Sequence, residues 1–423
     1  MVAAEQLTRS RVPIAESRRD RDPTRSRPPT VVWALAITQT VGYGVLYYAF
    51  AVVLTPVAAD LQTSATAITG ALTLAVIVSA VCAVPVGRWL DRHGGHAMMT
   101  TGSILGTLAV AGWSQVHTVT QLYVIFAMIG VASAMVLYEA AFAVLVAILD
   151  AAKSAKAILT VTVVVGFASS VFIPLTGYLT DVYGWRTAVL ALAGILAAAT
   201  VPLHALALRP TRPSATSSTT DVAVHAAVHD GGFWLITAGF VLHGAALLAV
   251  AVHLVTYLVT LGHPASVAAV ITGLLGILSV TGRLITAGLT RWLPIAVVTA
   301  AVFGLQGMAV AGLLITGRSL FGAVACVVMF GLGFGVATIA RPSVLVHRYG
   351  RAGYATIAGY LATPTTFGRA GAPLVAAAVA AATGYPAVMV GIAAACLIAA
   401  ACLLAADRNR VSRFEVDDLI AMS

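Results

Sequence analysis

The sequence carries very little charge. Asp, Glu, Lys and Arg make up 9% of its 423 residues, whereas hydrophobic residues make up 60%. A soluble domain of this length cannot bury so much apolar surface, so the composition excludes that class and indicates an integral membrane protein. The apolar runs are continuous and about 20 residues or longer, which favours spanning helices over the alternating pattern of a transmembrane β-barrel. We therefore predict an all-α membrane fold.

Cysteine and the motifs of nucleotide chemistry are also scarce. Because the four cysteines lie in apolar runs without metal-ligand spacing, we expect them to be packing residues, with no disulfide and no zinc site. A glycine-rich Lys-Ser/Thr loop is absent, which argues against ATP-driven pumping. Hydrolytic residue arrangements are absent as well. The sequence thus predicts no enzyme, no bound cofactor and no metal. The cysteines are Cys82, Cys326, Cys396 and Cys402.

The chain divides into two sets of apolar runs. Residues 1–30, rich in Arg, Pro, Ser and Asp, are expected to form a disordered tail; no short apolar core with a cleavage site follows, so we predict no signal peptide. The longest break, Arg209–Gly232, is predicted to link six-helix halves at 31–208 and 233–405, ahead of a tail at 406–423. The twelve predicted spans are 31–58, 66–87, 98–116, 119–148, 157–180, 186–208, 233–260, 265–289, 293–316, 319–346, 354–381 and 385–405.

Basic residues are distributed unequally between the two sides. If the amino terminus is cytoplasmic, nearly all Lys and Arg fall on cytoplasmic segments, and Arg186 and Arg318 alone lie outside. This asymmetry predicts a multi-pass protein of the cytoplasmic membrane with both termini inside. It also accounts for the basic composition without a nucleic-acid partner.

The two halves show signs of an internal repeat. Their first spans begin at Val31 and Phe233, 202 residues apart, and the same shift takes Glu139 to Arg341. The fourth helix of each half is therefore predicted to carry one buried charge at matching depth, with opposite signs.

The loop after the second span carries a family motif. Its sequence, Gly87-Arg88-Trp89-Leu90-Asp91-Arg92-His93-Gly94-Gly95-His96, resembles the signature of the major facilitator superfamily, in which a glycine is followed four residues later by Asp-Arg. The resemblance implies twelve helices in two pseudo-symmetric halves and secondary active transport by alternating access. It also implies a conformational latch: Asp91 would face the amino end of helix eleven near Gly353 and hold the outward-open state. Otherwise these residues only form a short turn. The latch residues are Gly87, Asp91, Arg92 and Gly94.

The chain departs from the family pattern at several positions. Gly95 stands where a basic residue is usual, Phe126 replaces the usual helix-four arginine, and the second-half loop lacks the aspartate. Pro174 and Gly177 are a fragment of a pattern associated with antiporters, although such a pair also occurs as a packing kink. Within the superfamily the chain looks most like the monocarboxylate transporter and oxalate/formate antiporter branch, whose aspartate four residues before the helix-eight arginine is Ser279 here.

Four charges lie inside the apolar spans: Glu139, Arg283, Arg341 and Arg369. Intramembrane charge is costly, so each residue is a functional candidate. Arg369 is predicted near the midplane as a substrate contact; the alternatives are a counter-ion to Glu139 or a donor to backbone carbonyls. Glu139 and Arg341 are predicted to pair across the halves as a gate or a static strut, and Glu139 could also carry a proton. Arg283 is a weaker substrate candidate, with a structural role as the alternative.

Polar residues on the first and seventh spans complete the candidate site. Gln39, Tyr43 and Tyr47 recur every four positions and are predicted to form one helical stripe that lines the cavity, or else a packing stripe. His243 is a gate or proton candidate. The positive interior favours a small organic anion, a monocarboxylate or dicarboxylate, with protons as the candidate coupling partner. Proton-coupled drug efflux is the first alternative, and a non-transporting membrane sensor or scaffold the second.

Overall fold

The computed structural model describes residues 28–208 and 217–421, so most of the predicted amino-terminal tail lies outside the described residues. Within them the chain is helical and contains no strand. The first bundle consists of α1 (Pro28–Tyr43), a π-helical turn η1 (Gly44–Tyr48), α2 (Ala49–Asp60), α3 (Ala65–His93), α4 (Gly95–Trp113), α5 (Val119–Val136), α6 (Tyr138–Ile148), α7 (Ala151–Val165), α8 (Ala168–Tyr183) and α9 (Trp185–Ala207).

The second bundle follows a short connecting helix, α10 (Ser217–His229). This helix was not predicted, because its Ser/Thr-rich sequence is typical of a linker. The bundle itself consists of α11 (Gly231–Thr260), α12 (Ala265–Leu289), α13 (Ile295–Thr316), α14 (Leu320–Gly333), α15 (Val336–Tyr349), α16 (Tyr354–Thr383) and α17 (Tyr385–Ala421).

Each predicted span coincides with one helix or with consecutive helices separated by a local irregularity. Ten helical segments of the described chain are long and apolar enough to cross a membrane. The other two, α4 and α16, are less apolar but pack against them, α4 on α5 and α9, and α16 on α3 and α11. The predicted all-α membrane fold is confirmed. Helix α17 continues through the segment predicted as a carboxyl-terminal tail.

Four spans are interrupted at mid-length. The first contains the π turn Gly44–Tyr48, and the fourth breaks at Leu137, whose backbone is extended. The fifth breaks at Gly166–Phe167 and the tenth at Phe334–Gly335. Irregular backbone at membrane depth is tolerated where it is buried in protein or lines a cavity, so we expect these breaks to pack against protein or to line the space between the bundles.

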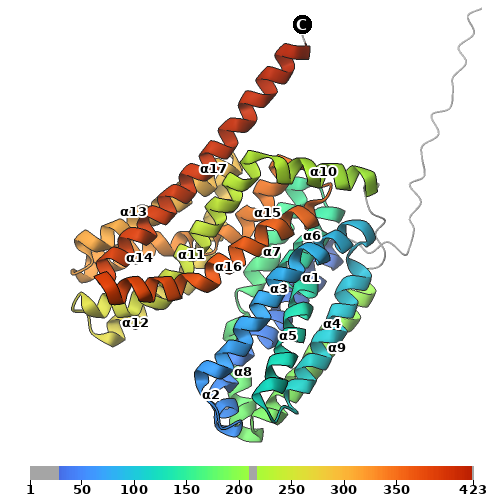
Figure 1. Cartoon of the computed structure of the whole chain (residues 1–423), viewed down its shortest axis with the longest axis vertical. Helices are drawn as coiled ribbons and strands as arrows, with labels where there is room; N and C mark the ends of the chain where they lie inside the picture. Colours follow the sequence, from blue (N-terminus) through green and yellow to red (C-terminus); the bar gives the residue numbers. More distant parts are fainter. Residues whose placement is uncertain (1–27, 209–216, 422–423) are drawn as a thin grey trace, which may run out of the picture.

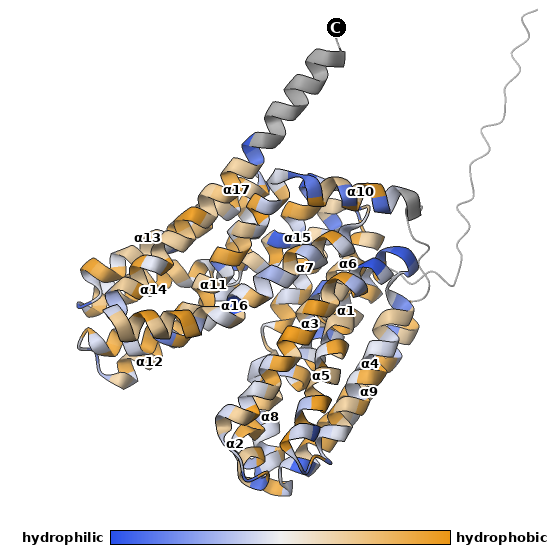
Figure 2. Ribbon diagram, in the orientation of Figure 1, coloured by the Kyte–Doolittle hydropathy of each residue, from blue (hydrophilic) through white to orange (hydrophobic). Residues whose placement is uncertain are grey.

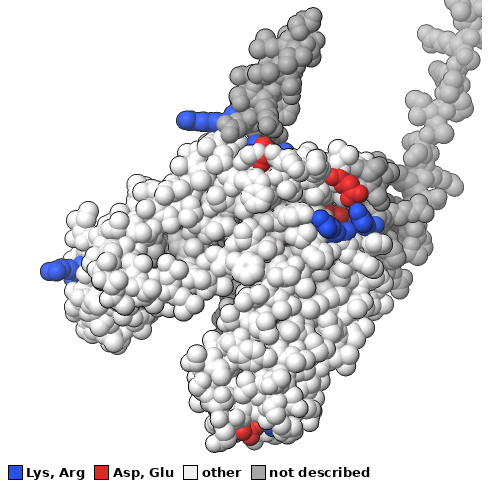
Figure 3. Space-filling view, viewed as in Figure 1, with Lys and Arg blue, Asp and Glu red and all other residues white. Residues whose placement is uncertain are grey.

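The two bundles diverge from a shared end. In Figure 1 they meet near α10, α6 and α15 and separate toward the α2–α3 connection of one and the α12–α14 region of the other. Figure 3 shows a hollow between the two arms. We call the end at which the bundles meet the closed end; it holds α10, the carboxyl end of α3 and the amino end of α16. The opposite end is the open end.

Hydrophobic residues predominate in both bundles (Figure 2), and many large apolar side chains are exposed on the outside. Leu108 is 62% exposed, Ile277 71% and Leu374 75%. An apolar exterior of this extent is stable only against lipid hydrocarbon, which agrees with the composition of the chain.

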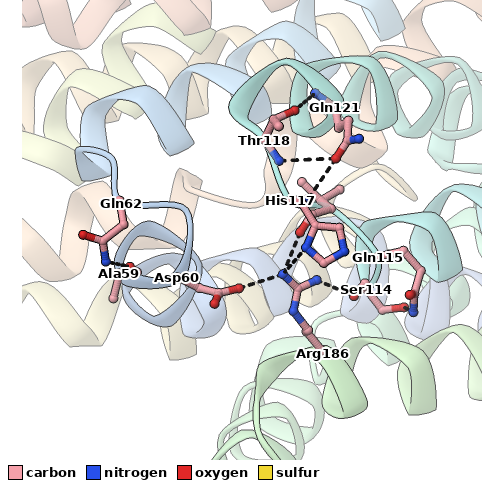
Figure 4. Close-up of polar contacts among 10 residues, drawn as sticks. Ala59, Asp60, Gln62, Ser114, Gln115, His117, Thr118, Gln121 and Arg186 are labelled. Atoms are coloured by element: carbon pink, nitrogen blue, oxygen red, sulfur yellow. Dashed lines mark hydrogen bonds and ion pairs between the residues drawn. The ribbon is translucent and has the colours of Figure 1, made fainter.

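Arg186 fastens the open end of the first bundle (Figure 4). Its guanidinium donates to the carbonyl oxygens of Ser114 and Val116, at 2.8 and 2.7 Å, and to Oδ2 of Asp60 at 2.7 Å. It also lies over the Trp185 ring, with Cζ 4.4 Å from the ring centroid. One side chain therefore ties α2, the α4–α5 connection and α9 together.

Candidate functional site

Glu139 and Arg341 form an ion pair between the bundles, across 202 residues of sequence. Nη2 of Arg341 donates to Oε1 of Glu139, and the side chains are 17% and 31% exposed respectively. The break at Leu137 restarts the helix, which places Glu139 in the first turn of α6. A carboxylate is stabilised there by the positive end of the helix dipole. The pair thus joins α6 to α15.

Arg369 lies on α16 with no described partner. Within residues 28–208 and 217–421, no hydrogen bond or ion pair holds its guanidinium, and the side chain is exposed. Its stem crosses α11 at Gly244, where an added Cβ would stand 2.9 Å from Cγ of Arg369. Its charge also acts on Tyr43 of α1 and on His243. The guanidinium is therefore located between the two bundles, and it is distinct from the Glu139–Arg341 pair.

His243 is fully buried beside this region. Its Nε2 lies 2.7 Å from Oε1 of Gln306, whose Nε2 donates to the carbonyl oxygen of Phe330. The ring stacks on Phe303 with centroids 3.6 Å apart, and Nδ1 has no described hydrogen-bond partner. An unpartnered buried nitrogen costs free energy, which makes His243 a candidate for binding a proton or a polar ligand group.

Gln39, Tyr43 and Tyr47 do not form the single polar stripe that their spacing predicts. Gln39 is fully buried and donates to the carbonyl oxygen of Val136 at 2.5 Å, next to the α5–α6 break. Tyr43 packs on Tyr138, with ring centroids 4.5 Å apart. Beyond it the π turn changes the helical register, and Tyr47 is 46% exposed. Gln39 therefore supports the backbone, and Tyr43 is the member of the set that lies near Arg369.

Tyr138 was missed by the sequence analysis. Its ring lies between Tyr43 and Phe142, with the Phe142 centroid at 5.0 Å, and it directly precedes Glu139 in the chain. Aromatic residues adjoining an intramembrane charge are a signal that could have identified it, because an amphipathic ring shields a charge while offering a hydroxyl.

Arg283 is engaged by backbone oxygens. Nε donates to the carbonyl of Gly335 at 3.1 Å and Nη1 to the carbonyl of Thr162 at 3.0 Å. A Cβ at position 335 would stand 2.5 Å from Nε, so glycine is needed there for the guanidinium to fit. Arg283 thus joins α12 and the α14–α15 break to α7, and two of its N–H donors are already occupied within the protein.

The predicted contact between Asp91 and the start of α16 is present. The carboxylate accepts from the amide nitrogens of Ala355 and Thr356, at 3.1 and 2.8 Å, and from Oγ1 of Thr356 at 2.6 Å. Gly87 permits this approach, because an added Cβ would stand 2.4 Å from the carbonyl oxygen of Ala355. That the contact between Asp91 and α16 acts as a latch stays a prediction.

The two remaining latch residues have separate roles. Gly94 ends α3 with a φ of 78°, in the region that favours glycine. Arg92 pairs with Asp221 of α10 at 3.2 Å, in an exposed position. This partner could not be foreseen, since α10 was expected to be a linker.

At the closed end a second contact joins the bundles, and here the charged residue belongs to the second bundle and the helix end to the first. Arg351 donates from Nε to the carbonyl of Val146 and from Nη2 to that of Ala147, at 2.8 and 2.6 Å. These carbonyls are at the carboxyl end of α6, where a cation is favoured by the helix dipole. Each bundle therefore supplies a charged residue that binds a helix end of the other.

Asp230 anchors the second bundle at the same end. Its Oδ2 accepts from Nη2 of Arg348 and from the Tyr349 hydroxyl, both at 2.8 Å, and its Oδ1 accepts from the amide of Gly232. Burial opposes ionisation of this carboxyl group, but the hydrogen bonds from Arg348, Tyr349 and Gly232 outweigh it and lower the pKa of Asp230.

Comparisons with known proteins agree with this architecture. The family model described as Major Facilitator Superfamily matches residues 35–370. A search of curated proteins finds no match. Among solved structures, the transporter FucP in the outward conformation, described elsewhere as the E. coli fucose:proton symporter, is similar, with TM-score 0.73 and 14% identity over 90% of this chain and 99% of that one.

Two further structures are similar at 14% identity over 90% of this chain. A bacterial homologue of the iron transporter ferroportin, in an outward-facing state, has TM-score 0.71 over 99% of its length. The human organic anion transporter MFSD10 has TM-score 0.67 over 100% of its length. At 14% identity the similarity concerns the fold alone, and these comparisons do not distinguish the predicted monocarboxylate transporter branch from other branches. The family match spans most of the chain, and the chain belongs to the Major Facilitator Superfamily of membrane transporters.

Proposed function

We propose that this transporter carries a small organic anion with one carboxylate, and that Arg369 binds it. The observation that supports this most directly is the exposed guanidinium of Arg369, which lies between the bundles without a partner among the described residues. Arginine matches a carboxylate through two parallel N–H···O bonds, so an unpaired guanidinium at this depth fits such a ligand.

The other intramembrane arginines favour one carboxylate over two. Arg341 is neutralised by Glu139, and Arg283 is held by the carbonyl oxygens of Gly335 and Thr162. Arg369 is then the intramembrane arginine without a partner among the described residues, and its charge acts on Tyr43 of the other bundle. One similar structure is an organic anion transporter, which is in keeping with this proposal.

From the contacts at the closed end we infer how the bundles move during transport. Substrate would enter from the open end, and the bundles would then part at the closed end, which separates Glu139 from Arg341. A carboxylate that loses its partner in an apolar site binds a proton more readily. We place a coupling proton on Glu139, with His243 as the second candidate because its Nδ1 is unpartnered.

We further propose that the closed end faces the cytoplasm in the cytoplasmic membrane. The unequal distribution of Lys and Arg supports this orientation, with both termini inside. The rocking units would be residues 31–208 and 233–405, joined through 209–232, which includes α10.

Transport by reconstituted protein tests the proposal. Purified full-length chain in proteoliposomes would be assayed with monocarboxylates, dicarboxylates and cationic drugs, with and without a pH gradient. We expect uptake of a monocarboxylate, loss of that uptake in Arg369→Ala, and a partial loss in Arg369→Lys, which keeps the charge but not the planar fork.

Arg318→Ala, an exposed arginine between α13 and α14, is the matched control and should transport normally. Size-exclusion elution and helix content would show that each variant is folded. Unchanged anion transport by folded Arg369→Ala would contradict the proposal. If folded Arg369→Ala also transports cationic drugs as the wild type does, the efflux alternative would be favoured.

A further inference from the structure

A polar cavity at the closed end is separate from the site between the bundles. Its volume is about 410 Å³, within the usual range of small-molecule sites, and it lies between the end of α3, α10 and the start of α16. Figure 3 shows charged side chains gathered near α10 on a face that otherwise carries few charges. The cavity is lined by Arg88, Arg92, Thr220, Asp221, Val224, His225, Val228, His229, Thr356 and Tyr360.

The lining is basic and rich in hydrogen-bond donors. Arg88 donates to the Tyr360 hydroxyl at 2.8 Å and has no carboxylate partner within the described chain. Arg92 pairs with Asp221, but these side chains are 48% and 62% exposed, so solvent screens the pair and leaves the guanidinium available. The neighbouring acid, Asp91, is directed to α16 by three hydrogen bonds. One positive charge is thus left over for a ligand.

The two histidines add ring nitrogens to the same wall. Their rings stack with centroids 4.1 Å apart, and Nδ1 of His229 donates to the carbonyl of His225 at 2.8 Å. This bond fixes the Nδ1–H tautomer and leaves Nε2 of His229 without an internal partner among the described residues. Paired guanidinium groups with adjacent imidazoles are a typical set of ligands for phosphate oxygens.

The cavity lies at the end of a spanning helix, where lipid headgroups are expected. Arg88 and Arg92 belong to the last turns of an apolar spanning helix, α3. In the same turns Trp89 is 45% exposed and stacks on His93. Exposed tryptophan at the end of a spanning helix is typical of the membrane interface, where basic residues attract anionic headgroups.

From these observations we propose that the cavity binds a phosphate anion, supplied by the headgroup of an anionic phospholipid. Because its lining comes from both bundles and α10, and because Thr356 also donates to Asp91, the cavity is complete only while this end is closed. Because the ligand binds the closed conformation better than the open one, its binding favours the closed state. The site is independent of the transported substrate.

Thermal unfolding of the purified full-length chain in neutral detergent tests this site. The probes are dioctanoyl-phosphatidylglycerol, inorganic phosphate at matched ionic strength, and dioctanoyl-phosphatidylcholine as zwitterionic comparator. We expect phosphatidylglycerol to raise Tm in a saturable way, and phosphatidylcholine to do so far less. In Arg88→Ala/Arg92→Ala the apparent affinity should fall by about tenfold or more, the usual effect of losing a charged hydrogen bond.

Arg291→Ala, an exposed arginine at the same end that does not line the cavity, is the matched control and should keep the wild-type response. If the double variant fails to fold, Arg88→Gln alone removes the charge that lacks a carboxylate partner. A saturable response to inorganic phosphate that needs the same arginines would support the site and identify free phosphate as the ligand. Equal responses in the double variant and the wild type, or equal effects of the two lipids, would overturn the proposal.

Discussion

At the scale of single residues, the intramembrane charges differ in what they bind. Glu139 and Arg341 neutralise each other, whereas Arg283 uses carbonyl oxygens. Arg369 has neither kind of partner within the described chain. An intramembrane charge without a partner is expensive, so this difference separates a ligand-binding arginine from structural ones.

The pair between Glu139 and Arg341 gives a prediction at this scale. Removing either partner leaves a shielded charge uncompensated, which costs roughly 3–5 kcal/mol in buried pairs, so Glu139→Arg and Arg341→Glu should each lower Tm strongly. The double exchange, Glu139→Arg with Arg341→Glu, should restore most of the loss. Recovery stays incomplete because an arginine in the first turn of α6 is disfavoured by about 0.3–1 kcal/mol.

Thermal unfolding of the three variants in detergent measures this coupling. Additive losses in the double exchange would mean that the two side chains do not act as a pair.

The sequence predicted which residues carry the interior charges but not all of their partners. Composition and the 202-residue repeat identified Glu139 and Arg341 as equivalent. The partners of Arg283 and Arg351 are backbone carbonyls, and every residue has one, so no side-chain pattern could indicate them.

At the scale of helices, charge–dipole contacts at the closed end join one bundle to the other. Asp91 neutralises the amino end of α16 and satisfies two of its free amide groups. Helix ends leave such groups without partners inside the helix, so a carboxylate from a neighbouring bundle holds the two elements together.

Asp91→Asn should weaken this contact. The asparagine keeps a hydrogen-bond acceptor but loses the charge, at a cost of about 0.3–1 kcal/mol. We expect faster hydrogen exchange at the amino end of α16, by up to about fivefold, measured by mass spectrometry. Asp150→Asn is the control, because Asp150 pairs with Lys153 on the exposed surface, where both side chains are 72% exposed. Equal exchange in wild type and Asp91→Asn would remove the basis of the latch.

The positions of the spans were predictable, but their interruptions were not. The continuous apolar runs predicted the spanning helices, because the length and hydropathy of a run are enough to identify a span. The breaks at Leu137 and Phe334–Gly335 depend on backbone torsions, which apolar sequence does not specify. Helix α10 was missed because Ser and Thr favour caps and turns over helix interiors.

At the scale of the whole molecule, the bundles touch along a limited zone. Contacts between α3 and α16 run from Asp91 with Thr356 to Thr363, whose hydroxyl donates to the carbonyl of Ala80. Gly87 and Gly359 lie in this zone, and both face backbone of the opposite helix at less than 3 Å from an added Cβ.

Gly87→Val should therefore open the closed end. The new side chain would meet the backbone of Ala355, which cannot move aside as a flexible side chain could. Distances between spin labels on His93 and Ala352 should lengthen and broaden in the variant. Gly194→Val is the control, since no atom lies within 4 Å of an added Cβ there. An unchanged distance distribution in folded Gly87→Val would show that close packing here does not set the conformation.

The carbonyl contacts of Arg351 have a consequence for how the protein can change over evolution. The contact with α6 requires one particular side chain on one side and only a helix on the other, because the acceptors are the backbone oxygens of Val146 and Ala147. Substitutions at these two positions leave the acceptors in place, whereas any change of the arginine removes the two guanidinium donors. This contact with α6 is thus insensitive to the side chains at two positions of one bundle and depends on a single arginine codon in the other.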